Sequence, residues 1–253
     1  MSLYNSMIKS GHFFFRWRSY IPLLLIPPMA IAFEESTYVE EAIGDDFEDF
    51  VVLVCFIISL IGLAIRCFTV GFIPGSTSGR NTTEQRADHL NTSGMYSVVR
   101  NPLYLGNFII ILGVMLSIKV WWLVLIFSLV FFIYMEKIIL AEENFLHEKF
   151  GERYDTWRAK TPVIVPRFSQ WSAPEMTFSW KTVLKREYPA LLAIGTAFFI
   201  NEVITDLFIE GEEFYHWLED DIIWPAMFGL FLIISLTLRY LKKHTRVLKV
   251  EGR

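Results

Sequence analysis

Long apolar runs constrain this chain more than any other feature. A helix needs about 20 mainly apolar residues to cross the hydrocarbon core of a bilayer, and six runs approach that length: 20–33, 50–72, 103–118, 120–141, 188–209 and 222–241. Apolar residues make up 53% of the 253 residues, and charged residues only 20%, which argues against a disordered, collagen-like or disulfide-stapled chain. We therefore expect an all-α fold, a polytopic transmembrane bundle of about six spans.

The charged residues between the runs are sorted by sign. Segment 34–49 carries eight acidic residues and segment 210–221 carries six, and neither contains Lys or Arg. The other connecting segments and the two chain ends hold 20 of the 23 Lys and Arg residues. Because basic loops stay in the cytosol, this asymmetry predicts an integral membrane protein with both termini cytoplasmic. That membrane is the plasma or inner membrane in a bacterium, or the endoplasmic reticulum in a eukaryote.

The first apolar run has a second interpretation. It follows a basic lead and contains Ala30-Ile31-Ala32, which resembles the cleavage site of a signal peptide. The long lead and the internal pair Pro27-Pro28 favour a retained helix instead.

The overall charge and the cysteines exclude further classes. With a net charge of −4 and no basic domain, we expect no nucleic-acid partner. Cys55 and Cys67 would lie about 18 Å apart on one helix, too far for a disulfide. No metal site is predicted.

Several charged and aromatic residues fall inside or beside the predicted spans. We expect Arg66, Glu136 and Lys137 to anchor helix ends at the inner face, with the Arg66 stem snorkelling to the headgroups. Glu202 and Asp206 lie one turn apart, and the simplest explanation is that the helix ends just before them. Trp residues near the boundaries are typical of an interfacial belt; these are Trp17, Trp121, Trp122, Trp217 and Trp224.

Two segments predicted to be cytosolic carry the chemistry. The first, 91–106, reads NTSGMYSVVRNPLYLG, and the second, 141–166, reads AEENFLHEKFGERYDTWRAKTPVIVP. Pro102 suits the first turn of a helix, and the free amides of that helix start, beside Arg100, favour an anionic group. Gly106 permits close approach of a backbone or a flat ligand.

The intervening helical hairpin, 103–141, brings the two segments to the same membrane face. A ligand amino group would meet Glu142 and Glu143, and its carboxylate would meet Arg100. A flat ring would stack on an aromatic side chain, for which Tyr96, Tyr104 and Trp157 are the candidates. S-adenosylmethionine has all three parts, so we predict it as the cofactor.

These two segments resemble the isoprenylcysteine carboxyl methyltransferase family and its phospholipid methyltransferase relatives. That family shows Arg-His-Pro-x-Tyr-x-Gly, then a hairpin, then Glu-Glu-x-x-Leu and Phe-Gly-x-x-Tyr with a trailing Pro. The matching residues here are Arg100, Pro102, Tyr104, Gly106, Glu142, Glu143, Phe150, Gly151, Tyr154 and Pro166, with Trp157 at a later Tyr position. One departure stands out, since Asn101 replaces the His.

The resemblance implies a membrane methyltransferase that acts at the cytosolic face on a lipid or lipid-linked acceptor. Arg158 and Tyr154 would be catalytic, holding an acceptor carboxylate or phosphate that is already ionised at pH 7. The expected cofactor-binding residues are Gly94, Tyr96, Arg100, Asn101, Pro102, Tyr104, Gly106, Glu142 and Glu143. The expected acceptor contacts are Arg80, Arg86 and Trp157.

The acceptor stays open between a prenylcysteine carboxylate, a lipid phosphate such as that of lipid A, and a phospholipid amine. A reductase using NADPH and a small transporter are the alternatives from other classes. We expect three parts: an N-terminal segment with the first helix and the acidic loop (1–49), a methyltransferase core with a cytosolic cap over the cofactor (50–168), and two further helices with a basic tail (169–253).

Overall fold

The structure, a computed structural model, describes residues 3–18, 20–43, 45–75 and 87–252. Within these ranges all regular structure is helical, which confirms the all-α prediction. The bundle contains α2 (Ile26–Ile43), α3 (Asp45–Gly71), α5 (Pro102–Ser117), α6 (Trp121–Phe150), α8 (Trp180–Glu202) and α10 (Ile223–His244). The shorter elements are α1 (Leu3–Trp17), η1 (Ile21–Leu25), α4 (Met95–Val98), α7 (Glu152–Lys160), η2 (Phe168–Gln170), the π-helix η3 (Val203–Glu210) and α9 (Phe214–Asp220).

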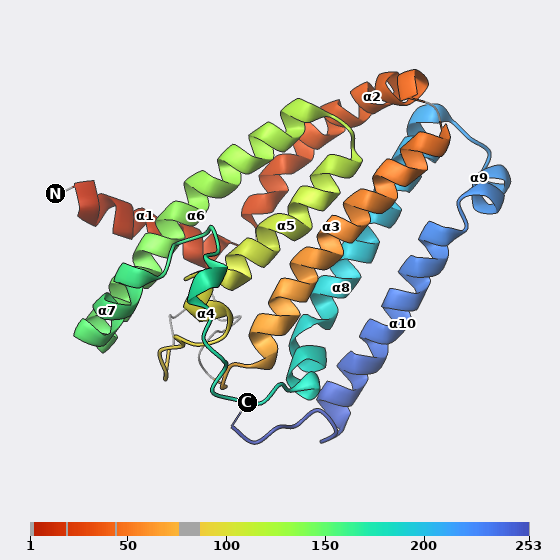
Figure 1. Ribbon diagram of the computed structural model, residues 1–253. Helices are drawn as coiled ribbons and strands as arrows, with labels where there is room; N and C mark the ends of the chain where they lie inside the picture. Colours follow the sequence, from red (N-terminus) through yellow and green to blue (C-terminus); the bar gives the residue numbers. More distant parts are fainter. Residues whose placement is uncertain (1–2, 19, 44, 76–86, 253) are drawn as a thin grey trace.

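The long helices run side by side (Figure 1). Four helical segments of the described chain are long and apolar enough to cross a membrane, and these are Glu48–Gly71, Trp121–Phe150, Trp180–Glu210 and Ile223–His244. The apolar α5 is shorter, and η1 with α2 forms the remaining rod of the bundle. The arrangement is roughly consistent with about six spans. Both chain ends, α4 and α7 lie toward one end of the bundle, whereas α9 lies at the other (Figure 1).

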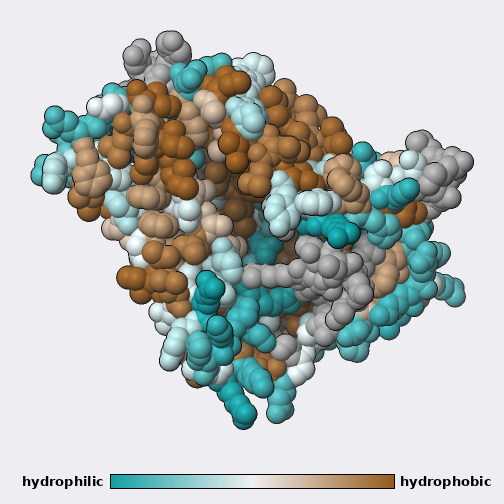
Figure 2. Space-filling model, turned by 180° about the vertical axis from the view of Figure 1, so that it is seen from behind, coloured by the Kyte–Doolittle hydropathy of each residue, from teal (hydrophilic) through white to brown (hydrophobic). Residues whose placement is uncertain are grey.

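The hydropathy of the surface also differs between the two ends of the bundle. Apolar side chains dominate the upper part of the face in Figure 2, and hydrophilic side chains gather at the lower end. The face is hollowed near its centre, where the two regions meet. A lipid-facing belt with a polar end is what a membrane-embedded bundle requires.

Several helix boundaries differ from the prediction. Helix α2 continues through much of the predicted acidic loop to Ile43, and α3 begins at Asp45. Pro27 and Pro28 are the second and third residues of α2, where backbone donors have no helical partner, so they begin the helix instead of breaking it. Helix α6 extends nine residues beyond the predicted end at Ala141.

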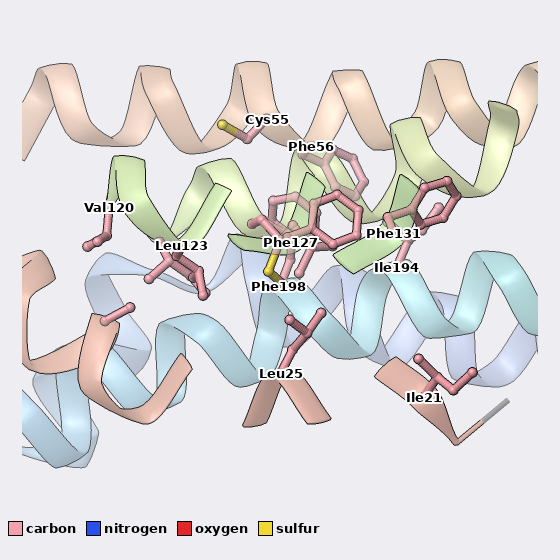
Figure 3. Close-up of a cluster of buried hydrophobic side chains, with 14 of the residues drawn as sticks. Ile21, Leu25, Cys55, Phe56, Val120, Leu123, Phe127, Phe131, Ile194 and Phe198 are labelled. Carbon is pink, nitrogen blue, oxygen red and sulfur yellow. The ribbon is translucent and has the colours of Figure 1, made fainter. Parts of the chain in front are cut away.

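Aromatic side chains fill the core between η1, α3, α6 and α8 (Figure 3). Phe127 and Phe198 are almost completely buried. The ring of Phe198 meets Phe56 edge-on at 5.2 Å and stacks on Trp224 at 5.7 Å. Such ring pairs contribute about 0.5–1.5 kcal/mol beyond burial, and tight packing of this kind is what holds helices together in lipid.

Helices α3 and α5 approach each other at glycines. A Cβ at Gly106 would lie 2.5 Å from Cγ of Arg66 and 2.9 Å from the carbonyl oxygen of Gly62. Gly106 therefore admits another backbone, one of the two options that its sequence position allowed. It faces α3, away from the carboxylates of α6.

Arg66 does not snorkel to the inner surface as predicted. Its Nε and Nη2 lie 2.8 and 2.7 Å from Oε2 of Glu187 on α8, and its Nη1 donates to the side chain of Asn107 on α5. The two charged side chains are only 15% and 5% exposed. The reason is that a buried carboxylate on α8 lies within reach, so pairing inside the bundle replaces contact with water.

Two tryptophans that were predicted to be interfacial, Trp217 and Trp224, are buried. Nε1 of Trp217 donates to Oδ2 of Asp206 at 2.8 Å. Trp17 and Trp121 are exposed, as a belt requires. The α-helix ends at Glu202 but continues as the π-helix η3, in which Asp206 lies.

The Arg66–Glu187 pair generates a stability prediction. Arg66→Met should lower the free energy of unfolding by about 3–5 kcal/mol, because Glu187 would remain buried without its charged partner. The double variant Arg66→Met/Glu187→Leu should regain most of that loss. Thermal unfolding in detergent would measure both, with the exposed Glu136→Gln as control. An Arg66→Met variant as stable as the control would contradict the pairing.

Candidate functional site

A strap of extended chain holds the turn before α5 in place. The backbone amide of Arg100 donates to Pro162 at 2.8 Å, that of Arg167 to Val98 at 2.9 Å, and that of Gly94 to Ser172 at 3.0 Å. Residues later in segment 162–172 pair with residues earlier in segment 94–100, so the two segments run antiparallel. Segment 162–172 thus fixes segment 94–100 from the cytosol-predicted end of the bundle.

A glycine turn places α7 against the end of α6. Gly151 adopts φ +54°, a left-handed conformation that favours glycine, and it separates the two helices. Asp155 then lies in the first turn of α7 and Arg158 in the last, which suits the helix dipole. The Phe-Gly part of the second motif is therefore a structural turn that brings α7 back onto α6.

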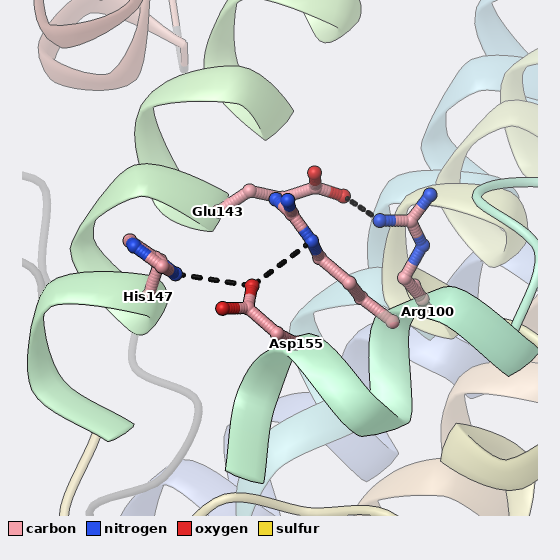
Figure 4. Close-up of polar contacts among 5 residues, drawn as sticks. Arg100, Glu143, His147 and Asp155 are labelled. Atoms are coloured by element: carbon pink, nitrogen blue, oxygen red, sulfur yellow. Dashed lines mark hydrogen bonds and ion pairs between the residues drawn. The ribbon is translucent and has the colours of Figure 1, made fainter. Parts of the chain in front are cut away.

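The two adjacent carboxylates of α6 have different partners. Oε1 of Glu143 accepts from Nη1 of Arg100 at 2.7 Å, and the two side chains point toward each other in Figure 4. Oε1 of Glu142 accepts from the hydroxyl of Tyr104 on α5 at 2.8 Å. The hairpin thus joins the two predicted motifs directly, through one ion pair and one charge-assisted hydrogen bond.

The side chains of α7 complete this cluster. Oδ1 of Asp155 lies 3.0 Å from Nδ1 of His147 on α6 and 3.2 Å from Nε of Arg158 (Figure 4). The guanidinium carbon of Arg158 lies 5.7 Å from the centre of the Tyr154 ring. The charges of Arg100 and Arg158 both act on Glu143. Arg100, Glu143, Tyr154 and Arg158 therefore form one cluster, which we call the charged cluster.

The charged cluster contains polar atoms that lack a partner. In the described part of the chain, Nε of Arg100 and the hydroxyl of Tyr154 are buried and make no hydrogen bond of normal geometry, although the hydroxyl lies beside Arg100. Burial raises the pKa of the Tyr154 phenol to about 12; the charge of Glu143 adds to the rise and Arg100 opposes it. The phenol is therefore neutral at pH 7. Buried orphan groups are costly, so these two indicate a place where a ligand would supply partners.

The other predicted cofactor residues have varied positions. Nε1 of Trp157 donates to the backbone oxygen of Tyr96 at 3.0 Å, and Nδ2 of Asn101 donates to that of Val163 at 3.1 Å. Pro102 is the first residue of α5, as predicted. Asn101, at the family's histidine position, thus helps to hold the strap. Arg80 and Arg86 lie outside the described residues.

An open hollow of about 530 Å³ lies on the outer side of α7, lined by Thr92, Glu152, Arg153, Thr156, Trp157 and Lys160. It shares only Trp157 with the predicted site residues. Because the paired charges and orphan atoms lie in the charged cluster instead, we place the candidate site there.

Comparison with known proteins gives independent information. Residues 52–153 match the phospholipid methyltransferase family. The resemblance to this family is confirmed. We call 52–153 the methyltransferase-family segment. It contains the α5–α6 hairpin with Arg100, Tyr104, Glu142 and Glu143, whereas Tyr154 and Arg158 lie just beyond it.

Two curated relatives each match about a third of this chain. The chain is 36% identical over 85 residues to the protein-S-isoprenylcysteine O-methyltransferase of Schizosaccharomyces pombe, covering 33% of this chain and 36% of that protein. It is 36% identical over 92 residues to the nickel-cobalt-cadmium resistance protein NccN of Alcaligenes xylosoxydans xylosoxydans, covering 36% of this chain and 40% of that protein. The chain thus spans less than half the length of each relative. No solved structure matches it.

The second relative's name concerns metals. Within the described residues, no group of three or more His, Cys, Asp and Glu side chains lies together in a way that could hold a metal ion. The likeness to NccN therefore carries no metal site into this structure.

The sequence analysis missed several contributors to the site. Asp155 had a usable signal, because it precedes Arg158 by three residues on one helix face. His147 and the strap residues Pro162 and Ser172 had none, since their contacts depend on how α7 and the strap fold back. Arg18, whose Nη1 lies 4.0 Å from Oε1 of Glu142, also had none.

Two tyrosines of the site should respond differently to removal of the hydroxyl. Tyr104→Phe should lower the free energy of unfolding by about 1.5–3 kcal/mol, because it removes a hydrogen bond to a carboxylate. Tyr154→Phe should leave stability unchanged or slightly higher, since it removes a buried hydroxyl that has no partner. Thermal unfolding of the two variants in the same detergent would compare them. Equal losses would show that the Tyr154 hydroxyl is already satisfied without ligand.

Proposed function

We propose that this chain is an S-adenosylmethionine-dependent methyltransferase of the membrane that O-methylates an anionic group on a lipid or lipid-linked acceptor. One observation carries the proposal: the adjacent carboxylates of the second motif, on α6, bind Arg100 and Tyr104 of the first motif, beside a buried arginine nitrogen and a buried phenol that make no normal hydrogen bond. Membership of residues 52–153 in a methyltransferase family supports the same conclusion.

The residues fit the predicted donor by charge. S-adenosylmethionine, when bound, supplies an electrophilic methyl group on a sulfonium centre. Glu142 and Glu143 would hold its ammonium group, and Arg100 would hold its carboxylate through the donors that Glu143 does not use. The ring of Trp157, which packs against the buried Tyr154 ring at 5.7 Å, offers aromatic surface for the flat base. Tyr96 and Gly94 shape the turn beneath this site.

Arg158 would bind the acceptor. A carboxylate or phosphate is already ionised at pH 7 and needs no general base. It needs a positive group that orients one oxygen, and a planar guanidinium can do this with two hydrogen bonds. Asp155 fixes one edge of Arg158 at 3.2 Å, which leaves the other edge for the acceptor. The neutral Tyr154 hydroxyl would donate to the same group. Alignment of this kind is the main contribution that a methyl-transfer site must make.

The distribution of charged residues supports a reaction at the cytosolic face. The end of the bundle with the charged cluster also holds both chain ends (Figure 1), which the distribution of Lys and Arg assigns to the cytosol. The strap and α7 would cap the donor from the cytosol, and the lipid tail would stay in the bilayer. In this proposal residues 50–168 form the catalytic core, and the flanking parts select the acceptor.

The acceptor is a carboxylate or a phosphate in our primary proposal. The fission-yeast relative is named for O-methylation of isoprenylcysteine, which favours a carboxylate, and Arg80 and Arg86 would assist a phosphate headgroup. The family description, phospholipid methyltransferase, favours a second candidate, methylation of a phospholipid amine. Incubation with labelled donor and total membrane lipid, followed by mass identification of the product, separates the three.

The first test of the proposal is ligand binding. S-adenosylhomocysteine at about 100 times its Kd should stabilise the detergent-solubilised protein by about 2.7 kcal/mol, whereas NADPH should not. Glu142→Gln and Glu143→Gln should weaken the stabilisation, because each removes a charge from the proposed ammonium site, and Glu136→Gln on the same helix should not. Stabilisation by NADPH alone would support a reductase and defeat the methyltransferase proposal.

The second test concerns Arg158. Arg158→Ala should lower kcat/KM by about 100-fold or more, as loss of a group that orients and stabilises reacting charge does, while stabilisation by S-adenosylhomocysteine persists. Arg158→Lys should recover little, because an ammonium cannot form the bidentate contact. Arg167→Ala, an exposed arginine in the strap, is the matched control. Full activity in Arg158→Lys would exclude the bidentate role.

A further inference from the structure

Helix α1 docks closely onto α6 beside the candidate site. At Gly11 an added Cβ would collide with the backbone oxygen of Lys137 and would lie 2.8 Å from Cβ of Ala141. Only glycine permits this approach. The contact lies directly before Glu142 on α6, so it fixes the end of α1 next to that carboxylate. Helix α1 lies outside the methyltransferase-family segment.

Arg18, just after α1, reaches the Glu142–Tyr104 pair. Its Nη1 lies 4.0 Å from the same Oε1 of Glu142 that accepts the Tyr104 hydroxyl. Its guanidinium carbon lies 4.4 Å from the centre of the Phe15 ring, a cation–π contact that restrains the side chain. The side chain is 19% exposed. Arg18 is therefore a fixed positive charge at the edge of the site.

The neighbours of Arg18 form an exposed aromatic edge. Phe13, Trp17 and Tyr20 are each more than two-fifths exposed, and their rings follow one another at 6.3 and 5.6 Å. Exposed Leu23 and Leu24 continue this surface into η1. Exposed aromatics beside an arginine are typical of the headgroup level of a bilayer, so Arg18 lies where the lipid surface meets the polar site.

We propose that Arg18 is a specificity-determining residue that binds the anionic headgroup, carboxylate or phosphate, of the lipid-anchored acceptor. This inference rests on the proposed function and deepens it. The methyltransferase-family segment supplies the charged groups assigned to the donor, which are Arg100, Glu142 and Glu143. Arg18 comes from outside that segment and adds a guanidinium that can bind such a headgroup in bidentate geometry.

The test measures headgroup preference separately from activity. Short-chain phosphatidic acid and a farnesylcysteine derivative with a free carboxylate are the anionic probes, and phosphatidylcholine with the same chains is the zwitterionic control. Binding to the full chain in detergent is followed by tryptophan fluorescence, since Trp17 adjoins Arg18. The wild type should prefer at least one anionic probe, and the preferred probe distinguishes a phosphate from a carboxylate acceptor.

Arg18→Ala should lose this preference, weakening binding of the anionic probe by about tenfold or more, because a charge-assisted hydrogen bond is lost. Arg18→Lys should keep part of it. Arg16→Ala, an exposed arginine two residues away, should keep all of it. Thermal unfolding shows whether each variant is folded. The intact mass of each purified protein shows that the N-terminal segment with residue 18 has not been removed by cleavage.

Two results would overturn the inference: an anionic preference in Arg18→Ala equal to that of Arg16→Ala, or no anionic preference in the wild type. Binding of S-adenosylhomocysteine, measured on the same samples, separates this from the proposed function. If the donor analogue binds and Arg18 has no effect on headgroup preference, only the inference fails. If the preference depends on Arg18 but the donor analogue does not bind, the proposed function fails and the headgroup site stands.

Discussion

Every polar group in the bilayer region must find its partner within the protein, and the rest of the structure depends on this constraint. Water is absent from the hydrocarbon core, so an unpaired charge there is expensive. The bundle meets the requirement with the Arg66–Glu187 pair between α3 and α8. At the polar end of α6 the same rule acts on Glu142 and Glu143, which are held by Tyr104 and Arg100. The candidate site is thus an exception to complete pairing, since Arg100 and Tyr154 keep buried atoms without partners.

The order of the helices along the chain and the backbone hydrogen bonds of the strap bring the residues of this site together. The α5–α6 hairpin sets the two motifs at one end of the bundle, and the turn at Gly151 returns α7 to the same place. The strap then pairs with the turn before α5 through backbone hydrogen bonds, which do not depend on side-chain identity. Asn101, which stands in place of the family's histidine, adds one side-chain contact to this pairing, because its Nδ2 donates to the backbone oxygen of Val163.

Much of the fold and part of the site were predictable. Apolar run length is a one-dimensional property, so the positions of α3, α5, α6 and α10 followed from it, and Pro102 marked the start of α5. The ends of the helices were harder to predict. Glu142 and Glu143 lie inside α6 because this helix continues past the apolar run and stops only at Gly151. Trp217 was assigned to an interface because sequence cannot show that Asp206 would bury it.

The sequence by itself determined that the chain is a helical membrane protein, that it carries two methyltransferase-type motifs, and that a hairpin joins them, because these are properties of composition, spacing and short motifs. Only the tertiary structure decided which charge pairs with which. Arg66 found Glu187, 121 residues away, and Arg18 reached Glu142 across the α1–α6 contact. Helix packing determines these partners, because a glycine or an aromatic ring sets the distance between two helix backbones. No local stretch of sequence determines that distance.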